Sequence, residues 1–197
     1  ADVLAQENVT LASTNDAVSV SKAVTSVTGN ISATANKFLT IGADVLAQKD
    51  VTLSSTNDAV SVNSAVTSVT GNVSVTADKS LTIGSTVTAQ KDVTLQSKSA
   101  NVKVDEAVTS VAGNISATAK TGLAVNDAVH ANQNVKLTSE TGGIGINAQV
   151  LSDTGDITME AGEGQIAIGE DVRAAGDVTI HVDISRSEER VSRNAET

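Results

Sequence analysis

Two histidines and a set of aspartates are the residues of this sequence that most often do catalytic or metal-binding chemistry. His130 and His181 have no carboxylate or second histidine at the spacing of metal ligands, so we interpret both as surface side chains. Asp16, Asp50 and Asp92 stand at turn positions that recur along the chain. An enzyme that cuts polysaccharides needs carboxylates that converge in a cleft, which long loops usually build. We therefore predict no catalytic residue, no metal site and no cofactor, and a protein that is not an enzyme.

Shorter motifs for ligand binding are incomplete. Gly142-Gly143-Ile144-Gly145 does not continue as a calcium-binding nonapeptide repeat, and no strand–GxGxxG–helix arrangement for phosphate is present. An outward column of Ser and Thr could bind ice or a crystalline surface. Its lysine and the lack of a paired second threonine argue against that function. Phe38 is the single aromatic residue, which disfavours a sugar-binding platform. Glycosylation sequons arise wherever an Asn at a turn precedes an outward hydroxyl, and they begin at Asn8, Asn30, Asn72 and Asn114.

The composition narrows the classes of partner. The chain has 197 residues, a formal net charge of −10, no cysteine and no proline. The negative charge disfavours nucleic acid, and the lack of cysteine excludes disulfides and thiolate metal sites. No run of about 20 apolar residues predicts a membrane span. Ala1 falls within the repeat pattern and no signal peptide precedes it, so we expect a fragment or a processed product.

One segment of 42 residues is repeated along nearly the whole chain. Residues 1–42 and 43–84 differ by nine substitutions, so 33 of 42 positions are identical. Residues 85–126 are a looser copy, 127–169 are a copy one residue longer, and 170–184 begin another. A period of this size indicates a repeat array. We therefore predict one solenoid domain over 1–184 and a polar, charged tail over 185–197.

Each copy divides into two rungs of about 21 residues, which we number along the chain as odd and even. The first column of inward residues, the core column, is valine in every rung: Val3, Val24, Val45, Val66, Val87, Val108, Val129, Val150 and Val172. A second column, the corner ladder, is Asn or Asp in every rung: Asn8, Asn30, Asp50, Asn72, Asp92, Asn114, Asn134, Asp156 and Asp177. Spacing along the corner ladder alternates between 22 and 20 residues as far as Asp156, because even rungs carry one more residue before the corner.

Each rung has the pattern of three short strands, which we expect at 3–5, 9–11 and 18–20 in the first rung. Recurrence of like residues at every rung is expected of a parallel coil with rungs ~4.8 Å apart. Hairpins would need repeated two-residue turns, and the abundant Val, Thr, Ser and Asn disfavour helices. We predict an all-β parallel β-solenoid of roughly nine rungs, about 40 Å long.

The residues around each corner carry a further expectation about backbone geometry. Asn and Asp tolerate left-handed angles, which suits a tight corner. Glycine precedes the corner at residues 29, 71, 113, 155 and 176, and we expect positive φ at these glycines.

The tail leaves the repeat pattern after about Ile180. Ser185 and Glu188 form a capping box, and Glu189 with Arg193 forms a favourable i,i+4 pair. A short helix over 186–195 and a disordered end are both compatible with this composition.

The segments GNISATA, KDVTLSS, GDITMEAG and AAGDVTI resemble the haemagglutinin-type repeats of filamentous haemagglutinin and related exoproteins of Gram-negative bacteria. The resemblance extends from Ala1 to about Ile180 and lies in the style of the repeat rather than in a unique motif. It implies a right-handed parallel β-helix, export by two-partner secretion and a location outside the cell, either secreted or on the surface. The Asn-Pro-type motifs of the secretion domain and a toxin-like end are not found in this sequence.

These observations favour a structural shaft segment of a bacterial adhesin, which presents other domains away from the cell. Its expected partners are further repeats of the same chain or other copies of it, and a host-surface receptor would bind outside this segment. We expect neither nucleic acid nor membrane insertion. The alternative is a filament subunit that stacks end to end through its open rungs. A third reading is a β-helix enzyme acting on carbohydrate.

Overall fold

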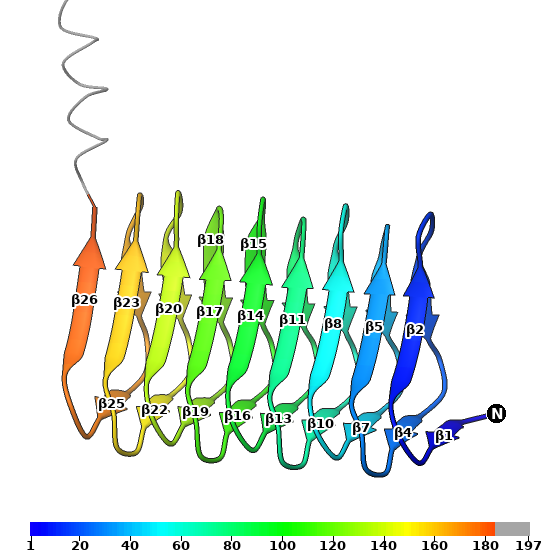
Figure 1. The fold of residues 1–197 in the computed structure, drawn as a ribbon. Coiled ribbons are helices and arrows are strands. Elements are labelled where there is room, and N and C mark those ends of the chain that lie inside the picture. The colour runs from blue at the N-terminus through cyan, green and yellow to red at the C-terminus, as the bar shows by residue number, and fades with distance from the viewer. Residues whose placement is uncertain (184–197) are drawn as a thin grey trace, which may run out of the picture.

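The computed structural model describes residues 1–183, which form 26 strands arranged in three parallel sheets (Figure 1). The chain visits the three sheets in turn, so every third strand belongs to the same sheet. The first sheet contains β1 (Val3–Ala5), β4 (Val24–Ser26), β7 (Val45–Ala47), β10 (Val66–Ser68), β13 (Val87–Ala89), β16 (Val108–Ser110), β19 (Val129–Ala131), β22 (Val150–Ser152) and β25 (Val172–Ala174).

The second sheet has the longest strands. It contains β2 (Val9–Ser13), β5 (Ile31–Ala35), β8 (Val51–Ser55), β11 (Val73–Ala77), β14 (Val93–Ser97), β17 (Ile115–Ala119), β20 (Val135–Ser139), β23 (Ile157–Ala161) and β26 (Val178–Val182). The third sheet contains β3 (Val18–Val20), β6 (Leu39–Ile41), β9 (Val60–Val62), β12 (Leu81–Ile83), β15 (Asn101–Val104), β18 (Gly122–Val125), β21 (Ile144–Ile146) and β24 (Ile166–Ile168). Rung 1 therefore comprises β1 to β3, and rung 9 comprises β25 and β26.

The pairing register places residues one rung apart side by side. Val66 pairs with Val45 on one side and with Val87 on the other, both in parallel. The core column is a continuous row of such pairs from Val3 to Val172 along the first sheet. This arrangement confirms the predicted parallel β-solenoid and excludes antiparallel hairpins from the described residues.

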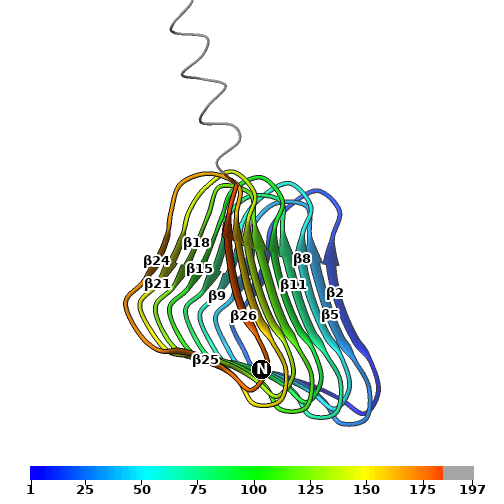
Figure 2. The same cartoon turned by 90° about the vertical axis from the view of Figure 1, so that its left-hand side faces the viewer.

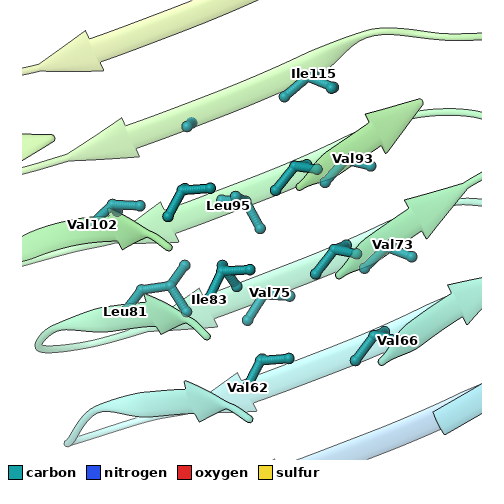
Figure 3. Close-up of a cluster of buried hydrophobic side chains, with 14 of the residues drawn as sticks. Val62, Val66, Val73, Val75, Leu81, Ile83, Val93, Leu95, Val102 and Ile115 are labelled. Atoms are coloured by element: carbon teal, nitrogen blue, oxygen red, sulfur yellow. The ribbon is translucent and has the colours of Figure 1, made fainter. Parts of the chain in front are cut away.

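The three sheets wrap around one axis, as the view along the coil shows (Figure 2). The aliphatic side chains that they enclose form one core cluster. Alternate residues of each strand point inward, and Val66, Leu81 and Val73 are fully buried. Figure 3 shows Leu81 and Val102 stacked on neighbouring strands of the third sheet, facing side chains of the second sheet. The strands of the second sheet are two residues longer than expected, so they supply a third inward position, occupied by Ser or Ala up to rung 8.

Three turns join the strands of each rung, and two of them alternate in length. The first turn, from the first sheet to the second, has three residues in rung 1 (6–8) and four in rung 2 (27–30). The second turn, from the second sheet to the third, is counted up to the first inward residue of the third-sheet strand, because β15 and β18 begin one residue before that position. By this count it has four residues in rung 1 (14–17) and three in rung 2 (36–38). The alternation breaks in rung 8, whose second turn (162–165) keeps four residues and accounts for the longer fourth copy. The predicted tail, 185–197, lies outside the described residues, as does the helix proposed there.

Candidate functional site

The nine residues of the corner ladder lie one above another at the start of the second sheet. The side-chain Oδ1 of each accepts a hydrogen bond from the backbone N–H of the next. The N–H of Asn30 donates to Asn8 Oδ1 at 2.8 Å, and the N–H of Asp50 donates to Asn30 Oδ1 at 2.9 Å. The same bond recurs at every later step to Asp177. The ladder thus gives each corner amide after Asn8 an acceptor supplied by the rung before it.

Asparagine and aspartate are not equivalent in this ladder. Asn72 donates both its backbone N–H and its Nδ2 to Asp50 Oδ1, at 2.8 and 3.0 Å, and Asn114 makes the same two bonds to Asp92. An ionised aspartate has no side-chain donor and can only accept. Asp50 and Asp92, considered above as candidate carboxylates, are therefore acceptors in a structural ladder.

The glycines before the corner have a different role from the one expected. Among residues 1–183, Gly164 alone has positive φ, at 82°, and no Asn or Asp does. The expectation of left-handed corners was therefore wrong. Glycine is needed because a β-carbon would meet the corner side chain of the preceding rung: it would lie 2.6 Å from Asn8 Oδ1 at Gly29 and 2.5 Å from Asp92 Oδ1 at Gly113. The corner ladder occupies the space of that methyl group.

Buried serines at the end of the first-sheet strands were missed by the sequence reasoning. Ser68 is 2% exposed; its Oγ donates to the carbonyl of Lys49 at 2.6 Å and accepts from the N–H of Gly71 at 3.0 Å. The same pair of bonds occurs in every even rung, at Ser26, Ser68, Ser110 and Ser152. Odd rungs, whose first turn has three residues, carry alanine at this position. The hydroxyl therefore accompanies the extra turn residue and satisfies its backbone.

The second turn follows the same rule in the opposite rungs. Ser97, in an odd rung with a four-residue turn, donates to the carbonyl of Lys79 at 2.5 Å and accepts from the N–H of Ala100 at 3.1 Å. Even rungs have alanine there, as at Ala77. Ser139 is the exception, since its buried Oγ has no hydrogen-bond partner. The signal available in the sequence was the alternation of Ser and Ala in step with the 22 and 20 spacing.

Asp16 is an exposed turn residue, as expected. Its carboxylate accepts from the N–H of Ala17 at 3.0 Å and pairs with Lys37 at 3.2 Å. The hydrogen bond from Ala17 and then the Lys37 ammonium lower the pKa of Asp16. A carboxyl group stabilised in its charged form is a poor general acid at neutral pH.

The two histidines lie on different outer faces. His130 Nε2 is 2.8 Å from Asp153 Oδ2, a carboxylate that the next rung supplies and that spacing along the sequence did not reveal. Both side chains are more than 40% exposed. His181 pairs in register with Glu160 on the second sheet. No cluster of three His, Asp or Glu residues capable of holding a metal ion occurs within 1–183.

The outer face of the second sheet carries hydroxyl groups in two columns rather than the single one expected. The first is Thr10, Ser32, Thr52, Ser74, Thr94, Ser116, Lys136, Thr158 and Thr179. The second, two residues further along each strand, includes Thr34, Ser54, Thr76, Thr118 and Thr138. Gln96 and an ion pair between Lys136 and Glu160, at 2.9 Å, interrupt these columns. Hydroxylated side chains suit a half-buried pleated surface without any ligand.

No helix among residues 1–183 is long and apolar enough to cross a membrane. Comparison of the chain with protein-family models, with curated proteins and with solved structures gives no match. The likeness to haemagglutinin-type repeats therefore stays a prediction from the sequence.

Proposed function

We propose that this chain is a structural shaft segment of a secreted or surface-exposed bacterial adhesin, and that it presents other domains away from the cell. The observation that carries the proposal is the unbroken corner ladder beside an unbroken core column through nine rungs. A coil whose rungs all repeat the same ladder and core contacts lengthens without changing its cross-section, which is what a spacer requires. The adhesin role and the location come from the resemblance of the repeats.

The turns support a passive role. Each turn within 1–183 has at most four residues, and acidic side chains on the turns take part in stacking contacts such as the pair of Lys79 with Asp58 at 3.3 Å. A carbohydrate-active enzyme would instead need carboxylates that face each other across a cleft. The contact of His130 with Asp153 is exposed on the outer face.

Two measurements test the shaft. The coding sequence on either side of this segment is expected to contain further 42-residue repeats, and a stop codon directly after it would contradict the proposal. Electron microscopy of the purified chain is expected to show single rods about 40 Å long at every concentration. Fibres of one rung's width that grow with concentration would support the filament alternative, and loss of polysaccharide on incubation would support the enzyme.

A further inference from the structure

The open N-terminal face of rung 1 presents groups that the other odd rungs satisfy on an even rung. Rungs 3, 5 and 7 each stack on an even rung and make the same two backbone contacts there, and rungs 3 and 5 also share a serine contact. Rung 1 has the same turn lengths as these rungs, and its residues match those of rung 3 closely. The partner of rung 1 can therefore be deduced from three copies of one interface within the molecule.

The first of these groups is the N–H of the residue before the corner. In rungs 3, 5 and 7 it donates to the carbonyl of the even-rung glycine: Lys49 to Gly29 at 3.0 Å, Lys91 to Gly71 at 2.9 Å and Gln133 to Gly113 at 2.9 Å. Glu7 holds this position in rung 1. The N–H of Glu7 therefore lies where an even rung would supply a glycine carbonyl.

The second group is the corner amide itself. The N–H of Asp50 donates to Asn30 Oδ1 at 2.9 Å, and the N–H of Asp92 donates to Asn72 Oδ1 at 3.1 Å. Asn8 is the first residue of the corner ladder, so its N–H points toward the position of a further Oδ1.

The third group is the serine of the four-residue second turn. Ser55 and Ser97 donate to the carbonyls of Lys37 and Lys79, each in the three-residue turn of an even rung. Ser13 is the equivalent residue of rung 1; its Oγ accepts from the N–H of Asp16 at 3.1 Å but meets no such carbonyl. An even rung would supply the acceptor.

The apolar residues of the same face are uncovered. Val3 is 40% exposed, against 2% for Val45 at the equivalent place in rung 3. Val3, Leu11, Val20 and Val24 line a hollow there. Covering this surface with the inward residues of another rung is favourable by the hydrophobic effect.

A second copy of this chain would offer the wrong kind of rung. The last described rung of such a copy is rung 9, which is odd and has a three-residue first turn, 175–177, as rung 1 does. Within 1–183, no three-residue first turn stacks on another. In odd rungs the carbonyl before the corner accepts a serine hydroxyl from the rung above, as Lys49 does from Ser68, and rung 1 has Ala5 in place of that serine.

Four-residue second turns stack directly on each other in one place, between rungs 7 and 8, and it shows what such a pair requires. A β-carbon at Gly162, the first residue of the upper turn, would collide with the carbonyl of Glu140. Rung 1 carries Thr14 at the position of Gly162, so it is not adapted to rest on an odd rung.

We propose that the N-terminal face of the coil is built to receive an even rung of a further repeat, and that rung 9, the last described rung of a second copy, does not match it. The identity of the partner as another repeat rests on the proposed shaft function. That the matching rung is an even one rests on the hydrogen bonds of the odd rungs alone.

The test joins one extra rung ahead of Ala1 in the full chain. One fusion carries residues 64–84, an even rung, and the matched control carries residues 43–63, an odd rung of equal length. Amide hydrogen exchange at Glu7 and Asn8 is expected to slow at least tenfold in the even fusion relative to the unmodified chain, and less than threefold in the odd fusion. In the even fusion, Ser13→Ala is expected to lower the midpoint of thermal unfolding more than it does in the unmodified chain.

Equal protection of Glu7 and Asn8 by the two fusions would contradict the preference of this face for an even rung. An equal effect of Ser13→Ala in the even fusion and in the unmodified chain would contradict it as well. Protection of Glu7 and Asn8 that rises with the concentration of the unmodified chain would show that a second copy covers this face, which also overturns the inference. The preference for an even rung can be wrong while the shaft function is right, because a shaft requires only that further rungs, odd or even, adjoin this segment. That function is tested separately by the flanking coding sequence.

Discussion

Gly71 lies directly above Asp50, and the missing β-carbon at this position leaves room for the corner ladder to continue. In Gly71→Ala the new methyl group would collide with Asp50 Oδ1 and with the backbone of Lys49. We expect a loss of about 1–3 kcal/mol in the free energy of unfolding, because the strain cannot relax without breaking the ladder bonds on either side. Urea unfolding measures this loss.

Gly145→Ala is the matched control, since a β-carbon there would meet nothing within 4 Å. Its effect is expected to stay within about 0.5 kcal/mol of zero. If the two substitutions had the same effect, close contact with the ladder would not be the reason for glycine at position 71. The sequence predicts positive φ at the glycines before the corner, and that prediction is wrong because the close approach of the preceding rung, not the backbone angle, requires glycine there.

At the scale of the turn, the buried serine determines whether an extra residue is tolerated. Ser68→Ala removes the acceptor of the Gly71 N–H and the donor to the Lys49 carbonyl. Leaving these two backbone groups unpaired in a buried place is expected to cost about 1–3 kcal/mol. Ser74→Ala, on the outer face of the neighbouring strand, is the control and is expected to change stability by less than about 0.5 kcal/mol. Chemical denaturation of the two variants under the same conditions decides the matter, and indistinguishable midpoints would remove the role assigned to the hydroxyl.

The strands were predictable because their signal is periodic, whereas the turn chemistry was not. Val3, Val24 and Val45 recur at one spacing, and a parallel register is the arrangement that puts such residues in contact. The role of Ser68 depends on which carbonyl of the preceding rung faces it, and spacing alone does not give that direction. The pair of His130 with Asp153 has the same origin, because it joins residues 23 apart that only stacking brings together.

Across the whole molecule, stability should depend on position along the stack, because each rung contacts only its neighbours. Val60 is 1% exposed and has rungs on both sides, whereas Val172 is half-buried in the last described rung. Val60→Asp places an unpaired charge in the shared core and is expected to cost about 4 kcal/mol or more, unfolding several rungs together. Val172→Asp has solvent within reach and is expected to loosen the C-terminal rungs alone.

Hydrogen exchange measured strand by strand separates the two cases: Val60→Asp should release β6, β9 and β12 at one rate, and Val172→Asp should leave them protected. A local effect of Val60→Asp, confined to β9, would mean that the rungs are held by their own contacts rather than by the stack, and the coil would then not behave as a single shaft.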